Sequence, residues 1–136
     1  MFERDYLMRI IAELGAAMRR SLERSQADRN PEDAAKMLDA AIGEATELDG
    51  AALLSLSPES IASVLQVSGT DPAVTEYLCR SLMLSSRYHA EGGDAALADL
   101  RAGQARAIAA AYGHSLSAED GDLEAIERFL DEELEK

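Results

Sequence analysis

Residues 57–84, SPESIASVLQVSGTDPAVTEYLCRSLML, decide the fold class of this chain. Ser57 and Asp71 each come directly before a proline, which is the pattern of a capped helix N-terminus. Gly69 lies between these two starts, where a residue with a left-handed backbone commonly ends a helix. The stretch therefore predicts two helices joined by a short turn, and it has none of the alternation of period two that is typical of a strand.

Similar signals lie on both sides of this stretch. Asn30 precedes a proline and two acidic residues, and Asp94 follows the Gly92-Gly93 pair. Because β-branched residues are also sparse, we predict an all-α fold: one domain over residues 1–136 with about six helices. Its predicted parts are a long N-terminal helix over 3–27, a helical core over 31–113 and an acidic C-terminal helix over 118–134.

Apolar residues at helical spacing give each predicted helix one buried side. The C-terminal half of the first helix is mostly polar, so we expect that half to be exposed or to fray. The second helix is expected to end near Asp49-Gly50, and residues 51–56 to form a short connector. The predicted inward side chains are Leu7, Ile11, Leu14, Met18 and Leu22 in the first helix and Leu123, Ile126, Leu130 and Leu134 in the last.

The chain is strongly acidic. Thirteen Lys and Arg stand against 26 Asp and Glu, a formal net charge of -13. Residues 1–30 hold six Arg and five acids, so the rest of the chain carries -14. Such a field repels nucleic acid and anionic membranes and favours basic partners. The arginines of the first helix are expected to be solvated or to rest against the acidic body.

The sequence also indicates a compartment. Cys79 is the single cysteine, which excludes an intrachain disulfide and suits a reducing environment. No apolar run reaches the length of a membrane span, and the opening MFERDY lacks the basic and apolar regions of a signal peptide. We therefore expect a cytoplasmic protein without a membrane partner.

Part of the chain resembles a degenerate tetratricopeptide unit. Leu84-Ser85, Tyr88 and Gly92 follow the spacing of the first helix of that unit, with Ser in place of Gly. The resemblance covers about half of the chain without a complete unit, and it implies stacked helical hairpins. Its second-helix positions are matched by Ala98, Ala102 and Ala105, and further upstream by Ala34, Leu38, Ala41 and Ile42.

The opening, MFERDYLMRIIAEL, resembles the start of a family of small bacterial all-helical proteins that begin M-F-x-x-D-Y-[IL]-x-R-x-I. This resemblance implies a tetratricopeptide-like fold. It brings no assigned activity, cofactor or site residue. The residues that match are Met1, Phe2, Asp5, Tyr6, Leu7, Arg9 and Ile11.

Residues 57–82 also have a spacing similar to that of a helix-turn-helix, in which the second helix enters the major groove of DNA. The reading helix would carry Asp71 and Glu76 where contacts to bases and phosphates need Arg, Asn or Gln, and only Arg80 is basic. Its turn is longer than usual. A DNA-binding regulator is therefore the alternative function, and the acidic charge favours a plain packed hairpin.

No catalytic, cofactor-binding or metal-binding residue is predicted. His89, with Glu91 and Asp94 nearby, comes closest to a metal group, but the helical spacings Glu-x-x-His and His-x3-His are missing. His89 and the distant His114 are expected to be surface or capping residues. Cys79 lies in mid-helix and is expected to be a small buried residue. The sequence also lacks a Gly-x-Ser-x-Gly elbow and a Gly-rich phosphate loop.

The sequence therefore predicts a protein that is not an enzyme. Its expected function is that of a protein–protein or peptide interaction module, with a second copy of the chain as one form of partner, giving a homodimer. The apolar stripe of the first helix is wide enough both to pack inside the molecule and to extend into a partner. Nucleic acid is disfavoured as a partner, and no cofactor is expected.

Overall fold

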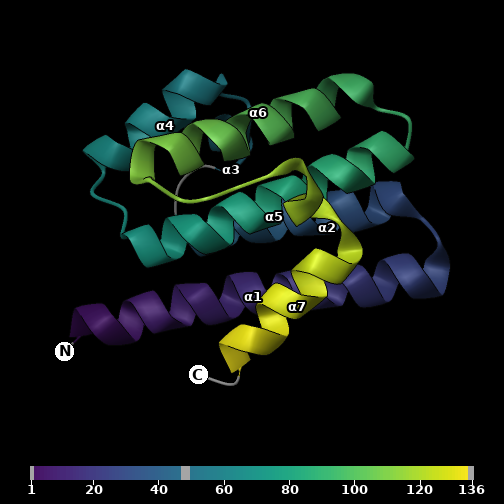
Figure 1. The fold of residues 1–136 in the computed structure, drawn as a ribbon, viewed down its shortest axis with the longest axis horizontal. Coiled ribbons are helices and arrows are strands. Elements are labelled where there is room, and N and C mark those ends of the chain that lie inside the picture. Colours follow the sequence, from purple (N-terminus) through teal and green to yellow (C-terminus); the bar gives the residue numbers. More distant parts are fainter. Residues whose placement is uncertain (1, 47–49, 135–136) are drawn as a thin grey trace.

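The computed structural model describes residues 2–46 and 50–134, and within these ranges the protein is all-α (Figure 1). The described residues form seven α-helices and one 3-10 turn, and none of them lies in a strand. No helix in the described part of the chain is long and apolar enough to cross a membrane. The elements are α1 (Phe2–Asp28), α2 (Pro31–Thr46), α3 (Gly50–Leu54), α4 (Pro58–Val67), α5 (Pro72–Glu91), α6 (Ala95–Tyr112), η1 (Ala118–Gly121) and α7 (Leu123–Leu134).

Side-chain caps start four of the helices at the predicted positions. In each case a side-chain oxygen accepts a hydrogen bond from a backbone N–H two or three residues further on, at 2.8–3.3 Å. Gly113 ends α6 with a left-handed backbone (φ 72°), a conformation that glycine adopts without strain. The four caps are Asn30 for α2, Ser57 for α4, Asp71 for α5 and Asp94 for α6.

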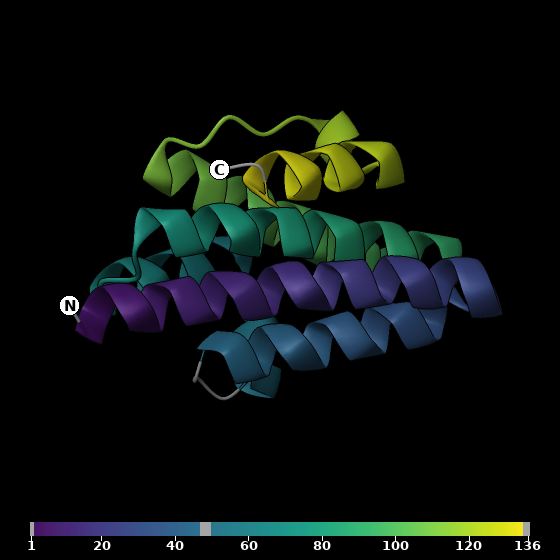
Figure 2. The same cartoon turned by 90° about the horizontal axis from the view of Figure 1, so that it is seen from below.

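Two antiparallel helix pairs, α1–α2 and α5–α6, stack on each other (Figure 1). Helix α5 packs against α1, α2 and α6, which makes it the central helix. Helices α1 and α5, the first members of the two pairs, run in the same direction (Figure 1). Figure 2 shows α2 and α7 on opposite sides of this α1–α5 layer. This arrangement confirms the predicted stack of helical hairpins.

Aliphatic side chains and alanines fill the space between the pairs. Tyr88 of α5 is the largest fully buried side chain in the described chain. Alanines let neighbouring helices approach closely, because the distance between two helix axes depends on the side chains at the contact. The inward residues predicted for the second-helix positions include Ala34, Leu38 and Ile42 on α2 and Ala98 and Ala105 on α6, and all of these are buried.

Helix α1 stays regular to Asp28, and its C-terminal half does not fray. Ser21 and Leu22 in that half are 0% and 5% exposed. The Ser21 hydroxyl donates to the Met18 carbonyl at 2.7 Å and lies 3.0 Å from the Tyr88 hydroxyl. Of the two expected outcomes, fraying is therefore wrong and exposure is confirmed for most of the stretch: Ser21 and Leu22 are buried, but Arg20, Glu23, Arg24, Gln26 and Ala27 are exposed.

Helix α4 packs mainly against α6 rather than against α5. The close approach depends on Gly103, where an added Cβ would come within 3.0 Å of the Pro58 ring. The predicted hairpin of the helices at 57–69 and 71–92 is therefore wrong in its packing, although both helices form. The connector α3 folds as one helical turn before them.

The acidic C-terminal stretch is not one helix from residue 118. It begins with the separate turn η1, and α7 starts at Leu123. The Asp120 carboxylate accepts the Ser117 backbone N–H at 2.7 Å and closes this turn. An added Cβ on Gly121 would lie 3.2 Å from the Met83 carbonyl oxygen, so the chain passes close to α5 at this point. These local contacts replace the first turns of the predicted helix.

Helix α2 spans Pro31–Thr46 and α3 begins at Gly50, so the predicted end of the second helix near Asp49-Gly50 falls at residues that the structure does not describe. Leu48 and Asp49 lie outside the described residues, and so does the side chain of Leu134. The remaining stripe residues of the first and last helices are buried or half-buried as predicted.

Candidate functional site

An apolar groove of about 690 Å³ lies between α1, the beginning of α5 and the end of α7; we call it the α1–α5 groove. Nearly all of its lining is aliphatic, aromatic or glycine, with one cation and one carboxylate. The lining residues are Met8, Ile11, Ala12, Gly15, Ala16 and Arg19 from α1, Ala73, Glu76 and Tyr77 from α5, and Leu130 from α7.

Helical periodicity places the α1 residues of the groove on one side. Their spacing of three and four positions from Met8 to Arg19 forms a continuous stripe. This stripe lies beside the core stripe of Leu14, Met18 and Leu22, which is buried. Helix α1 therefore has a wide apolar side, of which one part fills the core and the other lines the groove.

The floor of the groove is formed where α1, α5 and α7 meet. Tyr77 is 9% exposed and Leu130 is 4% exposed. The Tyr77 and Phe129 rings pack edge to face, with centroids 5.0 Å apart and planes at 63°. An added Cβ on Gly15 would lie 3.7 Å from both Tyr77 and Leu130. The floor is thus firmly packed.

The walls of the groove are more exposed than its floor. Met8 is 57% exposed, one of the largest exposures of a bulky apolar side chain in the described chain. Arg19 at the other end forms an ion pair with Asp131 of α7 at 2.9 Å. Glu76 is half-buried and lines the groove near its α5 wall. The groove therefore offers apolar surface with a carboxylate beside it.

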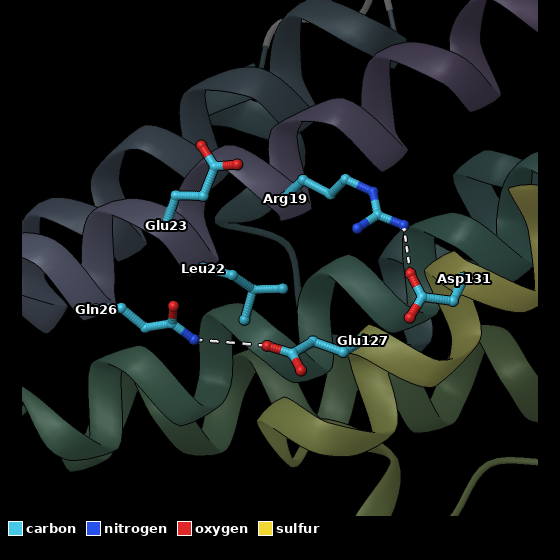
Figure 3. Close-up of a pocket in the computed structure, with 6 residues that line it drawn as sticks. All are labelled: Arg19, Leu22, Glu23, Gln26, Glu127 and Asp131. Carbon is cyan, nitrogen blue, oxygen red and sulfur yellow. Dashed lines mark hydrogen bonds and ion pairs between the residues drawn. The ribbon is translucent and has the colours of Figure 1, made fainter.

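A smaller, polar cavity of about 210 Å³ lies beside the Arg19–Asp131 pair (Figure 3), and it shares Arg19 with the α1–α5 groove. Its lower edge is closed by Gln26, whose amide donates to Glu127 at 3.5 Å (Figure 3). The side chain of Leu22 lies between these two contacts (Figure 3). The predicted contact of a first-helix arginine with the acidic body is thus present at Arg19. The cavity is lined by Arg19, Leu22, Glu23, Gln26, Glu127 and Asp131.

A buried polar cluster joins α2, α5 and α6. The Asp39 carboxylate accepts hydrogen bonds from the Ser85 hydroxyl at 2.6 Å and the Arg101 guanidinium at 3.2 Å. His89 Nε2 lies 3.1 Å from the same carboxylate. Arg101 and the fully buried Gln104 also donate to the Leu54 carbonyl at the end of α3. Through Leu54 the cluster also reaches α3, so it connects four helices in all.

This cluster lies beside a cavity of about 430 Å³ but does not have the geometry of a catalytic centre. The Ser85 hydroxyl is 0% exposed and donates to Asp39 rather than to a histidine, so a substrate cannot reach it as a nucleophile. The Arg101 guanidinium is satisfied at both terminal nitrogens within the protein. The arrangement fits a structural role. The cavity is lined by Glu32, Lys36, Asp39, His89, Asp94 and Leu97.

The histidines considered for a metal group have other partners. His89 is buried and faces Asp39 of α2, so a surface position for it is wrong. His114 Nε2 lies 2.9 Å from the Thr75 hydroxyl, and its ring stacks on Tyr112 with centroids 6.1 Å apart. Among the residues that the structure describes, no three His, Cys, Asp or Glu side chains come together as a metal site.

Cys79 is buried on α5, as predicted. Its thiol is 1% exposed and donates to the Ala105 carbonyl of α6 at 3.4 Å. Burial raises the pKa of the Cys79 thiol to about 12, and the nearby Arg80 opposes this only in part. A thiol in this environment stays protonated at neutral pH and is a poor nucleophile.

Of the segment with helix-turn-helix spacing, the second helix lies in the interior of the fold, whereas α4 lies at its surface. Helix α5, the would-be reading helix, buries side chains on most of its length and packs against α1, α2 and α6. A reading helix needs one exposed side that can enter the major groove. Arg80 instead pairs with Asp120 at 3.1 Å and lies over the Phe129 ring at 4.8 Å.

The sequence predicts a helical surface or groove but does not reveal the residues that line it. Met8, Ala73 and Leu130 lie far apart along the chain and meet only through the stacking of α5 and α7 on α1. Comparison with known proteins found no matching family model, no similar curated protein and no similar solved structure. The interpretation of the groove therefore depends on its geometry.

Proposed function

We propose that the protein is a non-enzymatic interaction module that binds an amphipathic helix of a partner protein in the α1–α5 groove. The observation that carries this proposal is the continuous apolar lining from Met8 to Leu130, open to solvent on one side. Soluble proteins rarely leave such a concave apolar surface uncovered without a binding role.

The shape of the groove favours a helix as its occupant. Between Met8 and Arg19 the groove follows α1 for about 16 Å, which corresponds to about three turns of a helix. Small side chains at Ala12, Ala16 and Ala73 allow a second helix to approach closely. Helix α7 already lies against the neighbouring part of the α1–α5 layer (Figure 2). Its apolar side chains Ile126, Phe129 and Leu130 are buried.

The other functions that the sequence left open have less support. A DNA-binding regulator would need an exposed side of α5, and it would show salt-dependent binding to duplex DNA that is strongest at low salt. The resemblance of the opening to a bacterial helical family agrees with a hairpin stack but assigns no function. An enzyme with a serine or cysteine nucleophile would need an accessible hydroxyl or thiol, and Ser85 and Cys79 are both buried.

A peptide selection tests this proposal. A display library of helical peptides, about 20 residues long with varied apolar sides, is selected on the wild-type protein. Binders are then measured on the Ala12→Glu variant, which places a charge in the groove, and on Ala110→Glu, which makes the same change at an exposed alanine of α6 outside the groove. We expect Ala12→Glu to weaken binding by at least about 10-fold and Ala110→Glu to leave it nearly unchanged.

Three results would count against the proposal. One is a selection without binders, and another is a set of binders that both variants bind as tightly as the wild type. The third concerns a homodimer: if no peptide binds and sedimentation shows a wild-type dimer that Ala12→Glu dissociates, the occupant is a second copy of the chain.

A further inference from the structure

The C-terminal residues 118–134 lie on the α1–α5 layer in the manner of a bound ligand. Helix α7 buries Ile126, Phe129 and Leu130, which are at most 7% exposed. Its other side faces solvent and is mainly acidic. An extended stretch over residues 114–117 connects it to α6 (Figure 1). This segment is an amphipathic acidic helix that is seated beside the proposed groove and shares Leu130 with it.

Three arginine–aspartate pairs hold this segment to the body of the protein. Arg19 of α1 binds Asp131 at 2.9 Å (Figure 3). Arg80 of α5 binds Asp120 at 3.1 Å. Arg87, two helical turns further along α5, binds Asp122 at 2.9 Å. The body presents arginines to the C-terminal segment even though the whole chain carries a charge of -13.

The seat combines these charges with apolar contacts. The Arg80 guanidinium lies 4.8 Å from the centre of the Phe129 ring, and Phe129 in turn contacts Tyr77. The pairs of Arg19 and Arg87 are partly exposed, with side-chain exposures of 38% and 40% for the two arginines. Exposed ion pairs contribute little stability and are screened by salt. A competing helix would have to replace both these pairs and the core contacts of Ile126, Phe129 and Leu130.

We propose that residues 118–134 are an intramolecular ligand of the α1–α5 layer, and that the partner is an acidic amphipathic helix that replaces them. This inference goes beyond the proposed function, because the seat of α7 lies beside the α1–α5 groove and the groove is open while α7 is bound. Such a partner places carboxylates against Arg19, Arg80 and Arg87 and an apolar side against the neighbouring Tyr77. The attached segment competes with it at a high effective concentration, so the partner binds the wild-type chain less tightly than a chain with a weakened segment.

A fluorescent synthetic peptide of residues 118–136 serves as the probe in this test. It is titrated into the full-length wild-type chain and into the triple variant Asp120→Asn, Asp122→Asn, Asp131→Asn, which lacks the three ion pairs of its own segment. Anisotropy should show binding to the triple variant at least about 3-fold tighter than to the wild type, because loss of three weak pairs together opens the seat more often. Added salt should weaken this binding.

Matched variants separate the proposed contacts from general effects. A full-length Asp33→Asn, Asp99→Asn variant changes two exposed aspartates away from the seat and should bind the peptide as the wild type does. A peptide with the three aspartates replaced by asparagine should bind the triple variant at least about 10-fold more weakly than the natural peptide. Circular dichroism checks that each variant keeps its helices.

The inference is overturned if a folded triple variant binds no peptide, or binds it no more tightly than the wild type does. Binding that the asparagine peptide retains in full would also overturn it. These failures differ from failure of the proposed function, because Ala12→Glu probes the open groove whereas the aspartate variants probe the seat of α7. Groove-dependent library binders without a trans-binding peptide would leave the proposed function standing alone.

Discussion

The Arg101 guanidinium of α6 lies 3.2 Å from the Asp39 carboxylate of α2, and the two side chains are only 7% and 17% exposed. A single acid thus faces a buried cation, a buried histidine and the Ser85 hydroxyl. Such a pair is costly to break, since removal of one partner leaves the other charge buried without compensation.

Replacing Asp39 should therefore destabilise the fold strongly. We expect Asp39→Ala to lower the free energy of unfolding by about 3–5 kcal/mol, because Arg101 stays buried without its carboxylate. Denaturation in urea measures the change. The matched control is Asp99→Ala, which removes an exposed carboxylate from α6 and should change stability by no more than about 0.5 kcal/mol. Equal effects of the two substitutions would contradict the structural role of the cluster.

Tyr88 and Ser21 form a second buried polar contact, 3.0 Å long, between α5 and α1. The Ser21 hydroxyl donates to the Met18 carbonyl, so it accepts from Tyr88. Ser21→Ala should cost about 1–3 kcal/mol because it leaves the Tyr88 hydroxyl buried without an acceptor. Tyr88→Phe should cost less, about 1 kcal/mol, and should reduce the further effect of Ser21→Ala. A double-mutant cycle with strictly additive effects would contradict this contact.

Because of Cys79, the free energy of unfolding should decrease as the pH rises above 9. Burial raises the pKa of its thiol from 9.0 to about 12, so above pH 9 the unfolded chain ionises while the native chain does not. The contribution of the protonated thiol to the free energy of unfolding is fully present below pH 9. It is lost as pH rises towards 12, at no more than about 1.4 kcal/mol per pH unit. Between pH 9 and 10 the wild type should lose more stability than Cys79→Ala. Parallel stability curves for the two proteins would contradict this prediction.

The same burial predicts slow chemistry at the thiol. A disulfide reagent at pH 8 should label Cys79 at a rate that follows unfolding of the chain, because the thiol is 1% exposed. Urea should therefore accelerate labelling in step with unfolding. Rapid labelling of the folded protein at the rate of a free thiol would show that the site is accessible.

Local chemistry explains which parts of the fold were predictable. Caps such as Ser57 and Asp71 act through hydrogen bonds within a few residues, so the sequence alone reveals where their helices begin. The apolar stripe of α1 was also predictable, because helical periodicity depends only on the spacing of residues along the chain. The partner of α4 was not, because its packing on α6 depends on a tertiary approach at Gly103.

Long-range contacts explain what the sequence did not reveal about the site. His89 was considered with its sequence neighbours Glu91 and Asp94, but its partner is Asp39 on another helix. The lining of the α1–α5 groove combines residues from three helices, and no spacing rule connects Met8 with Leu130. The prediction of one continuous helix over 118–134 was wrong. The turn at Asp120 and the close approach of Gly121 to Met83 interrupt it before α7 begins.

The most direct test of the proposed function locates a bound helix on the protein. With labelled methionine methyl groups, NMR follows Met8 in the groove and Met37 on α2 during titration with a library-selected peptide. We predict that the Met8 signal shifts in a saturable manner while the Met37 signal stays in place. A saturable shift of Met37 with an unchanged Met8 would contradict the proposal that the α1–α5 groove is the docking site.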